Sequence, residues 1–409
     1  MASDAAAGSV RTARWLTFLM FFMFAMTTDS VGLIIPEVIK EFHLTLTSAG
    51  ALQYGTMLGI ATAGLGLGFL ADRIGRKRAI LLGLSLFAAT AFLFPAAKTF
   101  PEILILITAA GVAIGIFKTG ALALVGDVSA SAVQFTSTMN LVEGFFGVGA
   151  IMGPLIVAQL ILNGVSWRWL YVVAGCLCTV LMLVAVMARY PRASLKGEAV
   201  PGVGRTLALL RDPRALAFSI GAFTYVAVES AIYVWMPTLL ADVRGAGQPL
   251  VAYALPVFFV LRALGRFLGA WTLQYVNWAS ALALAAILIF LCFAVSLSGG
   301  VGVALYALPL SGLFMSIVYP TINSRGIGSF PPAEHGAVAG IILFFSCTGA
   351  FLGPLLMGMA GDFYGGAIYC FALATALAAL LAGGAVLNWF MKPTDTAWGG
   401  TQAATGAVR

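Results

Sequence analysis

Six ionisable side chains fall inside long apolar runs of this sequence, where charged residues are rare. They are three acids and three bases: Asp29, Glu143, Glu229, Lys118, Arg262 and Arg266. An ionisable group in such a run is costly and usually belongs to an ion pathway or a proton relay. A carboxyl group can exchange a proton there, and a guanidinium can bind a carboxylate through two hydrogen bonds. Because the ionised set is neutral, we expect its acids and bases to pair with one another.

Protonation of one acid in this set would leave a positive charge without its partner. This predicts a coupling of protons to an anionic solute, whose carboxylate would take the place of the lost partner at Lys118 or at an arginine. The three acids are therefore the predicted proton-coupling residues. The alternative is that some of these charges only join helices or reach toward the membrane interface, in particular Arg262, one turn before Arg266.

Polar, aromatic and small residues near these charges predict a binding pocket. Tyr225 and Tyr233 flank Glu229 at i−4 and i+4, which places all three on one helix face. Gly111 and Gly115 share a face with Lys118 and would leave room for a ligand. Aromatic residues of membrane helices also serve packing and interface anchoring, so that alternative stays open. The predicted solute-binding residues are Lys118, Asn140, Tyr225, Tyr233, Arg262, Arg266, Tyr319 and Asn323.

The composition indicates that membrane helices position these residues. Of 409 residues, 61% are hydrophobic and 9% are charged, whereas soluble domains have roughly 45–50% and about 25%. Apolar runs of spanning length recur from Trp15 to Asn388, and we expect about twelve of them. The first run is too long for the core of a signal peptide, so we expect no cleavage. The predicted fold is an all-α membrane protein.

The net charge of +7 reflects topology and does not indicate a nucleic-acid partner. If the N-terminus is cytoplasmic, most basic residues in the loops fall on the cytoplasmic side. The opposite side then receives only Lys40, Lys98, Arg168 and Arg244. This is the positive-inside bias, and it predicts that both termini are cytoplasmic.

The chain has two similar halves. GAIMGPL at Gly149 to Leu155 recurs as GAFLGPL at Gly349 to Leu355, and the Asp29-Ser30 pair corresponds to Glu229-Ser230, each 200 positions later. Two parallel halves are a recurrent transporter architecture with a solute site near the midplane. The longest polar interruption is near the middle of the chain. We therefore expect a cytoplasmic tail at 1–14, a six-helix bundle at 15–189, a cytoplasmic linker at 190–213, a second six-helix bundle at 214–391 and a cytoplasmic tail at 392–409.

The loop after the second run, GFLADRIGRKR at 68–78, resembles the signature of the major facilitator superfamily. The resemblance implies two pseudo-symmetric six-helix bundles and a motif that latches them in one access state. The implied gating residues are Gly68, Asp72, Arg73, Gly75, Arg76, Lys77 and Arg78. The alternative for the last three is that they only anchor the loop on the cytoplasmic side.

Within the apolar runs the sequence resembles the fucose permease family of fucose, galactose and glucose proton symporters. The similar segments are TYVAVESAIYVW at 224–235, GRFLGAW at 265–271 and YPTINS at 319–324, and Asp29 lies where that family keeps a proton-carrying aspartate. Two departures bear on the solute. Lys118 stands where the family has a glutamate, and Glu143 and Phe146 replace a glutamine and a sugar-contacting asparagine.

These patterns predict a proton-coupled symporter of a small hydrophilic solute, either a sugar-like acid or another small organic anion. A neutral-sugar proton symporter is one alternative. The GxxxGP pattern from Gly149 to Pro154 supports another, a proton-coupled antiporter that exports lipophilic compounds. We expect no enzyme activity, metal or cofactor, because neither His43 nor His335 has a nearby ligand cluster and the cysteines lack metal-ligand spacing. The expected partners are the solute, protons and the lipid bilayer, for a monomer in a bacterial inner membrane.

Overall fold

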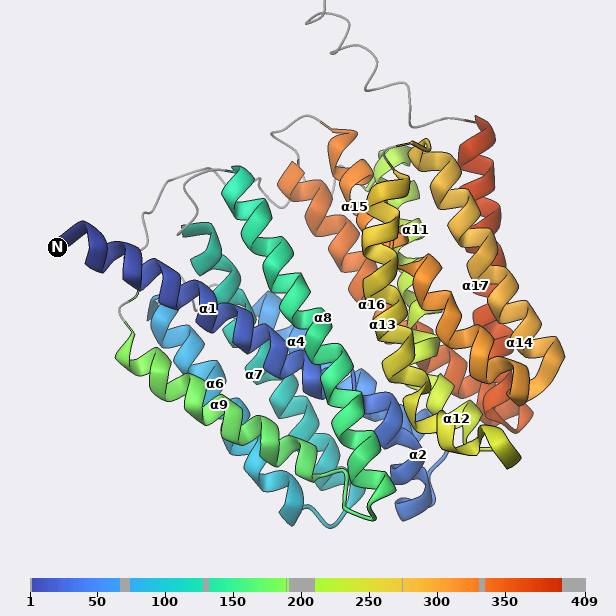
Figure 1. Cartoon of the computed structure of the whole chain (residues 1–409), viewed down its shortest axis with the longest axis horizontal. Coiled ribbons are helices and arrows are strands. Elements are labelled where there is room, and N and C mark those ends of the chain that lie inside the picture. Colours follow the sequence, from blue (N-terminus) through green and yellow to red (C-terminus); the bar gives the residue numbers. More distant parts are fainter. Residues whose placement is uncertain are drawn as a thin grey trace, which may run out of the picture. The chain divides into compact units, whose positions relative to one another are not determined.

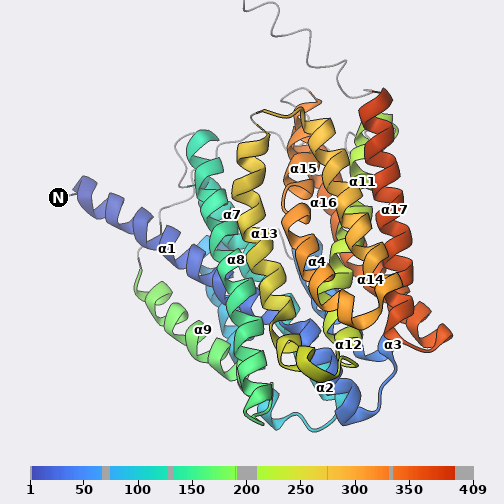
Figure 2. The same ribbon diagram turned by 45° about the vertical axis from the view of Figure 1, so that its right-hand side comes forward.

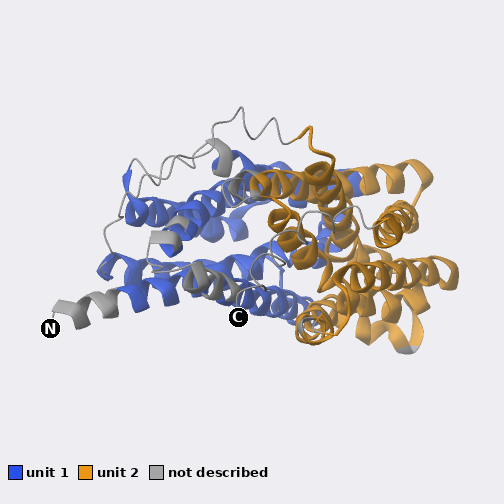
Figure 3. Cartoon of the chain, turned by 90° about the horizontal axis from the view of Figure 1, so that it is seen from above, with its two compact units in different colours: residues 1–197 blue, residues 198–409 orange. Residues whose placement is uncertain are grey.

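A computed structural model describes residues 2–66, 74–127, 132–188, 190, 210–273, 275–330 and 335–391. Within these ranges the regular elements are helices. The chain divides into two compact units, Met1–Gly197 (unit 1) and Glu198–Arg409 (unit 2), which Figure 3 colours separately.

Unit 1 contains the helices of the N-terminal half (Figure 1). In chain order they are α1 (Ala2–Thr28), α2 (Val31–Phe42), α3 (Leu46–Ala49), α4 (Ala51–Gly66), α6 (Arg76–Leu93), η1 (Phe94–Ala96), α7 (Phe100–Asp127), α8 (Ala132–Leu162) and α9 (Trp169–Met187). The pairs α1 and α8, α4 and α7, and α6 and α7 pack along their lengths. The core of the unit lies between these apolar helices.

Unit 2 contains the remaining elements. They are α11 (Pro213–Ser230), η2 (Ala231–Trp235), α12 (Met236–Leu240), η3 (Gly245–Leu250), α13 (Val251–Thr272), α14 (Trp278–Met315), α15 (Val318–Gly328), α16 (His335–Tyr364) and α17 (Ala367–Met391). Here α11 packs on α16, α13 on α14, and α14 on α17, and the last of these pairs is clear in Figure 2. The start of α11 follows from local chemistry: Asp212 accepts the backbone N–H of Arg214 at 2.8 Å, and Pro213 occupies the first turn, where its missing donor costs nothing.

The described residues hold ten helical stretches long and apolar enough to cross a membrane. The chain is thus a multi-pass membrane protein, while the predicted count of about twelve stays a prediction. One stretch, Trp278–Gly328, has 51 residues, far more than the ~20 that one crossing needs. It is interrupted at Gly300, whose φ of 75° and ψ of −177° break the helix inside α14.

The repeated glycine motif lies at the closest helix contact of each unit. A Cβ added to Gly149 or Gly153 would collide with backbone carbonyl oxygens of α1, those of Phe22 and Met26. In unit 2, a Cβ on Gly349 would collide with the carbonyl of Phe223 in α11, and one on Gly353 would lie 2.8 Å from Ala227. Small residues allow helix backbones to approach in membranes. The two motifs therefore perform the same packing function in the two units.

Gly111 and Gly115 do not leave room for a ligand, contrary to the sequence-based prediction. A Cβ at Gly111 would lie 2.5 Å from the carbonyl oxygen of Thr56, and one at Gly115 would lie 2.6 Å from Cβ of Ala63. The space in front of both glycines is filled by α4. Their lack of a side chain serves the contact between α4 and α7.

Candidate functional site

A buried ion pair joins α11 and α13 in unit 2. Nη2 of Arg262 lies 2.7 Å from Oε1 of Glu229, and the Glu229 side chain is only 8% exposed. Breaking a pair of this kind by removing one partner leaves a charge in an apolar environment. The predicted pairing of membrane acids and bases is thus present for these two residues. The pair therefore links α11 and α13 through one carboxylate.

Tyr225 completes this cluster from one turn earlier on α11. Its hydroxyl lies 2.8 Å from Oε1 of Glu229 and 2.9 Å from the carbonyl oxygen of Met315, so its single proton serves two acceptors. Tyr225 is fully buried, and its ring stacks on that of Tyr319 with centroids 6.3 Å apart. Met315 is the last residue of α14, and the break before α15 precedes Pro320, which cannot donate a backbone hydrogen bond.

The acids at corresponding positions of the two units both lie at interruptions of their helices. Asp29 occupies the gap between α1 and α2, and Glu229 lies just before the π-helical turn η2. Pro36 and Pro237 follow these interruptions within about two turns and remove backbone donors there. Irregular helical turns of this type are frequent at functional sites.

The position of Tyr233 relative to Glu229 is set by a π-helical turn, and its place in the predicted pocket stays a prediction. Tyr233 lies inside η2, whose wider turn shifts its angular position from the one that an α-helix would give. The hydroxyl of Tyr225, on the regular part of α11, contacts Glu229.

In unit 1, Asp29 is half-buried and accepts a hydrogen bond from a threonine. Oγ1 of Thr28 lies 2.9 Å from Oδ2 of Asp29, and the backbone N–H of Asp29 still donates to the carbonyl of Ala25. The carboxyl group therefore sits on the last turn of α1, directly beside the helix break.

Lys118 lies among phenyl rings. Its Nζ is 5.5 Å from the ring centroid of Phe24 and 5.8 Å from that of Phe21. The rings of Phe117 and Phe146 pack on Phe24, both with centroids 5.5 Å away. Among the residues that the structure describes, no carboxylate lies within ion-pair distance of this ammonium. The expected pairing of Lys118 with an acid is therefore wrong within this part of the chain.

The other predicted site residues are more dispersed. Glu143 is exposed on α8, and the side chain of Asn140 lies outside the described residues. Arg266 is half-buried on α13, one turn after Arg262, and Asn323 is half-buried on α15, one turn after Tyr319. The structure thus brings Tyr225 and Arg262 to the Glu229 carboxylate, with Tyr319 stacked on Tyr225 and the charge of Arg266 within electrostatic reach of Tyr225.

Part of the predicted gating motif is visible at the start of α6. Gly75 has a φ of 92°, which a residue with a side chain rarely adopts. Nζ of Lys77 donates to the carbonyl of Val186 at 2.7 Å and to that of Ala188 at 2.8 Å, at the end of α9. These contacts tie two helices of unit 1 together, because terminal carbonyls lack helical partners. Arg76 and Arg78 are half-buried and exposed, whereas Gly68, Asp72 and Arg73 lie outside the described residues.

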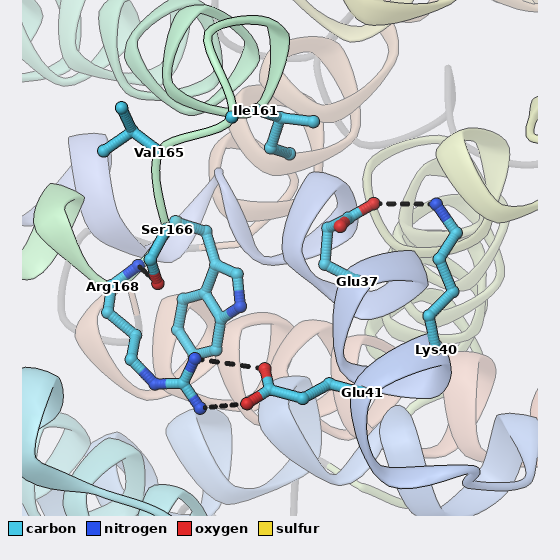
Figure 4. Close-up of a pocket in the computed structure, with 9 residues that line it drawn as sticks. Glu37, Lys40, Glu41, Ile161, Val165, Ser166 and Arg168 are labelled. Atoms are coloured by element: carbon cyan, nitrogen blue, oxygen red, sulfur yellow. Dashed lines mark hydrogen bonds and ion pairs between the residues drawn. The ribbon is translucent and has the colours of Figure 1, made fainter.

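A polar pocket of about 500 Å³ lies at the other end of unit 1 (Figure 4). The guanidinium of Arg168 binds both carboxylate oxygens of Glu41, at 3.0 Å and 2.8 Å, and Lys40 pairs with Glu37 at 2.9 Å. The Arg168 guanidinium also lies 4.8 Å from the Trp167 ring centroid. In each pair the acid and the base neutralise one another. The Arg168–Glu41 pair connects α2 to the turn before α9, so we interpret this pocket as structural.

Comparison with known proteins assigns the chain to a family. The family model of the Major Facilitator Superfamily matches residues 17–354, which is most of the chain. The chain belongs to the major facilitator superfamily. Its predicted fold class is thereby confirmed, and the chain is a transporter rather than an enzyme.

Relatives within the major facilitator superfamily include two bacterial sugar transporters. A glucose/galactose transporter of Brucella abortus biovar 1 (strain 9-941) is 26% identical over 368 residues, covering 85% of this chain and 87% of the relative. An L-fucose-proton symporter of Escherichia coli (strain K12) is 26% identical over 347 residues, covering 75% and 78%. The solved structure of the nucleoside transporter NupG has a TM-score of 0.73 at 16% identity, covering 93% of this chain and 99% of that one. This last likeness concerns the superfamily fold.

Two features of the site were not anticipated from the sequence. The phenyl rings around Lys118 come from α1, α7 and α8, and the acceptor at Met315 is a backbone atom. The proline of the YPTINS segment could have indicated the backbone acceptor at Met315, since a proline marks a break in a helix. The phenylalanines carried no such signal in a sequence with 29 of them.

Proposed function

We propose that the chain is a proton-coupled symporter of a small hydrophilic solute with a negatively charged group, such as a sugar acid or another small organic anion. The observation that carries this proposal is the ammonium of Lys118, which lies on the faces of Phe21 and Phe24 without a carboxylate partner among the described residues. A solute carboxylate would supply that partner. We further propose a bacterial inner-membrane location with both termini cytoplasmic, as the distribution of basic residues favours.

The energetics of the Lys118 environment support an anionic solute. A cation–π contact contributes about 0.5–2 kcal/mol. An ionised lysine costs about 2.5–3.5 kcal/mol at the centre of a membrane helix, and Lys118 lies in the last part of its apolar span, Phe100–Leu122, where the cost is smaller. The aromatic faces therefore offset part of the cost of the charge, and an anion that arrives with the solute would offset the rest.

Proton coupling is assigned to the two acids at the helix interruptions, Asp29 and Glu229. Protonation of Glu229 would release the guanidinium of Arg262, and the adjacent π-helical turn gives α11 a place at which to change its geometry. Asp29 corresponds to Glu229 in the other half. Glu143, which is exposed on α8, is the third candidate.

A neutral-sugar proton symporter is the second candidate function. It is favoured by the names of the two relatives, one a transporter of glucose and galactose and the other a symporter of L-fucose and protons. On this account Lys118 would only pack between α1 and α7. The two candidates differ in whether a carboxylate on the solute increases binding.

A matched pair of sugars separates these candidates. Thermal unfolding of purified protein is measured with D-glucuronate and with D-glucose, which differ at one carbon, and with a panel of small carboxylates. A ligand at a hundredfold excess over its dissociation constant stabilises the folded state by about 2.7 kcal/mol. We expect stabilisation by acids that is lost in Lys118→Gln and kept in Lys98→Gln, which removes an exposed lysine whose backbone N–H binds Glu102. Stabilisation by neutral sugars that persists in Lys118→Gln would favour the second candidate.

A further inference from the structure

An apolar cavity of about 410 Å³ opens between four helices of unit 2. Its lining includes Phe218 and Gly221 on α11, Trp278 on α14, Ile322 on α15, and Leu381 and Gly384 on α17. The volume lies within the range of about 300–1,000 Å³ that is typical of ligand pockets. The lining is nearly free of polar groups, so the occupant must be apolar where it fills the cavity.

The cavity lies at one membrane face. The candidate spans that form it begin at Pro213 and Trp278 and end at Gly328 and Met391. Trp278 and Met391 themselves line the cavity. Since these four helix ends fall on the same side, the cavity lies near the membrane surface, and the predicted topology makes that surface the cytoplasmic one.

A cationic side chain stands at the edge of this cavity. The guanidinium carbon of Arg325 lies 5.5 Å from the ring centroid of Trp278, and Arg325 is exposed on α15, one turn after the lining residue Ile322. Arg325 has no ion pair with a carboxylate among the residues that the structure describes. By contrast, Arg214 pairs with Asp212 at 3.2 Å. The charge of Arg325 is therefore available to an anion.

We propose that this cavity binds an anionic phospholipid of the cytoplasmic leaflet, with an acyl chain in the cavity and the headgroup phosphate at Arg325. An apolar slot with one arginine at its membrane-surface edge is complementary to a molecule with an acyl chain and a phosphate on adjoining parts. Arginine binds phosphate oxygens with two parallel hydrogen bonds, and one basic residue near an anionic surface increases lipid binding about fivefold. The lipid would hold α11, α15 and α17 together at their ends.

Glycines provide a steric test with a matched control. A Cβ added at Gly384 meets no atom within 4 Å, and the same holds for Gly383. Gly384 lines the cavity and Gly383 does not. Gly384→Leu should therefore fill the cavity without disturbing the fold, whereas Gly383→Leu adds the same side chain beside it.

The experiment is native mass spectrometry of the full chain in mixed micelles that contain either phosphatidylglycerol or phosphatidylcholine. We expect wild type to retain phosphatidylglycerol over phosphatidylcholine, Arg325→Gln to lose about fivefold of that preference, and Gly384→Leu to lose the bound lipid while Gly383→Leu keeps it. Melting temperatures in lipid-free detergent check that each variant is folded. Equal retention of the two lipids by wild type, an undiminished preference in Arg325→Gln, or lipid retained by Gly384→Leu would each overturn the proposal.

Discussion

Nη2 of Arg262 lies 2.7 Å from Oε1 of Glu229, so an ion pair joins α13 and α11 in unit 2. The same carboxylate oxygen is the one that Tyr225 contacts. Oε1 of Glu229 thus accepts both an ion-pair contact from Arg262 on α13 and a hydrogen bond from Tyr225 on α11. A change in the protonation of this carboxyl group would alter both interactions.

Removal of one partner of this pair should destabilise unit 2 more than removal of both. Arg262→Met leaves Glu229 buried, and breaking a buried pair in this way costs about 3–5 kcal/mol. The double variant Arg262→Met with Glu229→Gln should recover part of that loss. Thermal unfolding of the two single variants and the double variant measures the coupling, with Arg211→Met at an exposed site as control. Strictly additive losses would contradict a direct interaction.

Loss of the Tyr225 hydroxyl should destabilise the protein by about 1–3 kcal/mol. Tyr225→Phe leaves the carbonyl of Met315 and the Glu229 carboxylate each without one hydrogen bond in a buried site, and an unsatisfied buried acceptor costs that amount. Tyr306→Phe on the exposed face of α14 serves as the control, because this tyrosine is 64% exposed. Equal melting temperatures for Tyr225→Phe and wild type would show that the hydroxyl contributes nothing.

The repeated glycines should be intolerant of even one methyl group. Gly153→Ala would place its Cβ against the carbonyl of Met26 and within 2.5 Å of Oγ of Ser30, and overpacking of this kind costs about 1–3 kcal/mol. Gly147→Ala on the same helix meets no atom within 4 Å and should be neutral or slightly stabilising. Unfolding temperatures of the two variants decide the point, and similar values would contradict the close contact of α1 and α8.

Lys77 should stabilise unit 1 by connecting the start of α6 to the end of α9. Lys77→Met removes two hydrogen bonds to carbonyls at the end of α9, and because the site is partly exposed we expect a loss of about 1 kcal/mol. Arg78→Met, at the exposed neighbouring position, should change stability less. The comparison requires only melting temperatures. A larger loss in Arg78→Met than in Lys77→Met would contradict the assignment.

Asp212 should make stability depend on pH in the acid range. Burial raises the pKa of this carboxyl group. Hydrogen bonds and the charge of Arg214 together lower it by more, so the pKa in the folded state lies below its usual value. A lowered folded-state pKa contributes stability at neutral pH that is lost as pH falls through that pKa.

Two substitutions separate the cap from the charge of Asp212. Asp212→Asn keeps an acceptor for the first turn of α11 and should flatten the decline of stability in acid. Asp212→Ala should cost about 1 kcal/mol at neutral pH through loss of the cap. Melting temperatures measured from neutral pH down into the acid range test both expectations. An unchanged acid slope in Asp212→Asn would contradict the role of the charge.

Composition and motif predict the membrane fold and the superfamily because both depend on long stretches of sequence. The repeat of GAIMGPL and GAFLGPL likewise marks two equivalent helix contacts, those of Gly149 and Gly349. Side-chain partners are harder to predict. The sequence suggests a pairing of Lys118 with an acid, yet its ammonium lies over the rings of Phe21 and Phe24. Contacts across helices depend on the rotation of each helix about its axis, which periodicity leaves undetermined.

Helix irregularity and close packing limit the other predictions. The turn from Ala231 to Trp235 is π-helical, so α-helical i+4 spacing does not describe the position of Tyr233. The sequence predicts space for a ligand at Gly111, although small residues in membrane helices also mark close packing, here against Thr56. Sequence spacing specifies a face only where the helix is regular.

The most direct test of the central claim is proton movement driven by the solute. Proteoliposomes that contain a pH-sensitive dye are mixed with D-glucuronate or D-glucose, and empty liposomes correct for passive entry of the acid. An anion symporter predicts lumenal acidification with glucuronate or with another small carboxylate of the panel that is lost in Lys118→Gln and kept in Lys98→Gln. Acidification by D-glucose with no response to any carboxylate, unchanged in Lys118→Gln, would contradict the account.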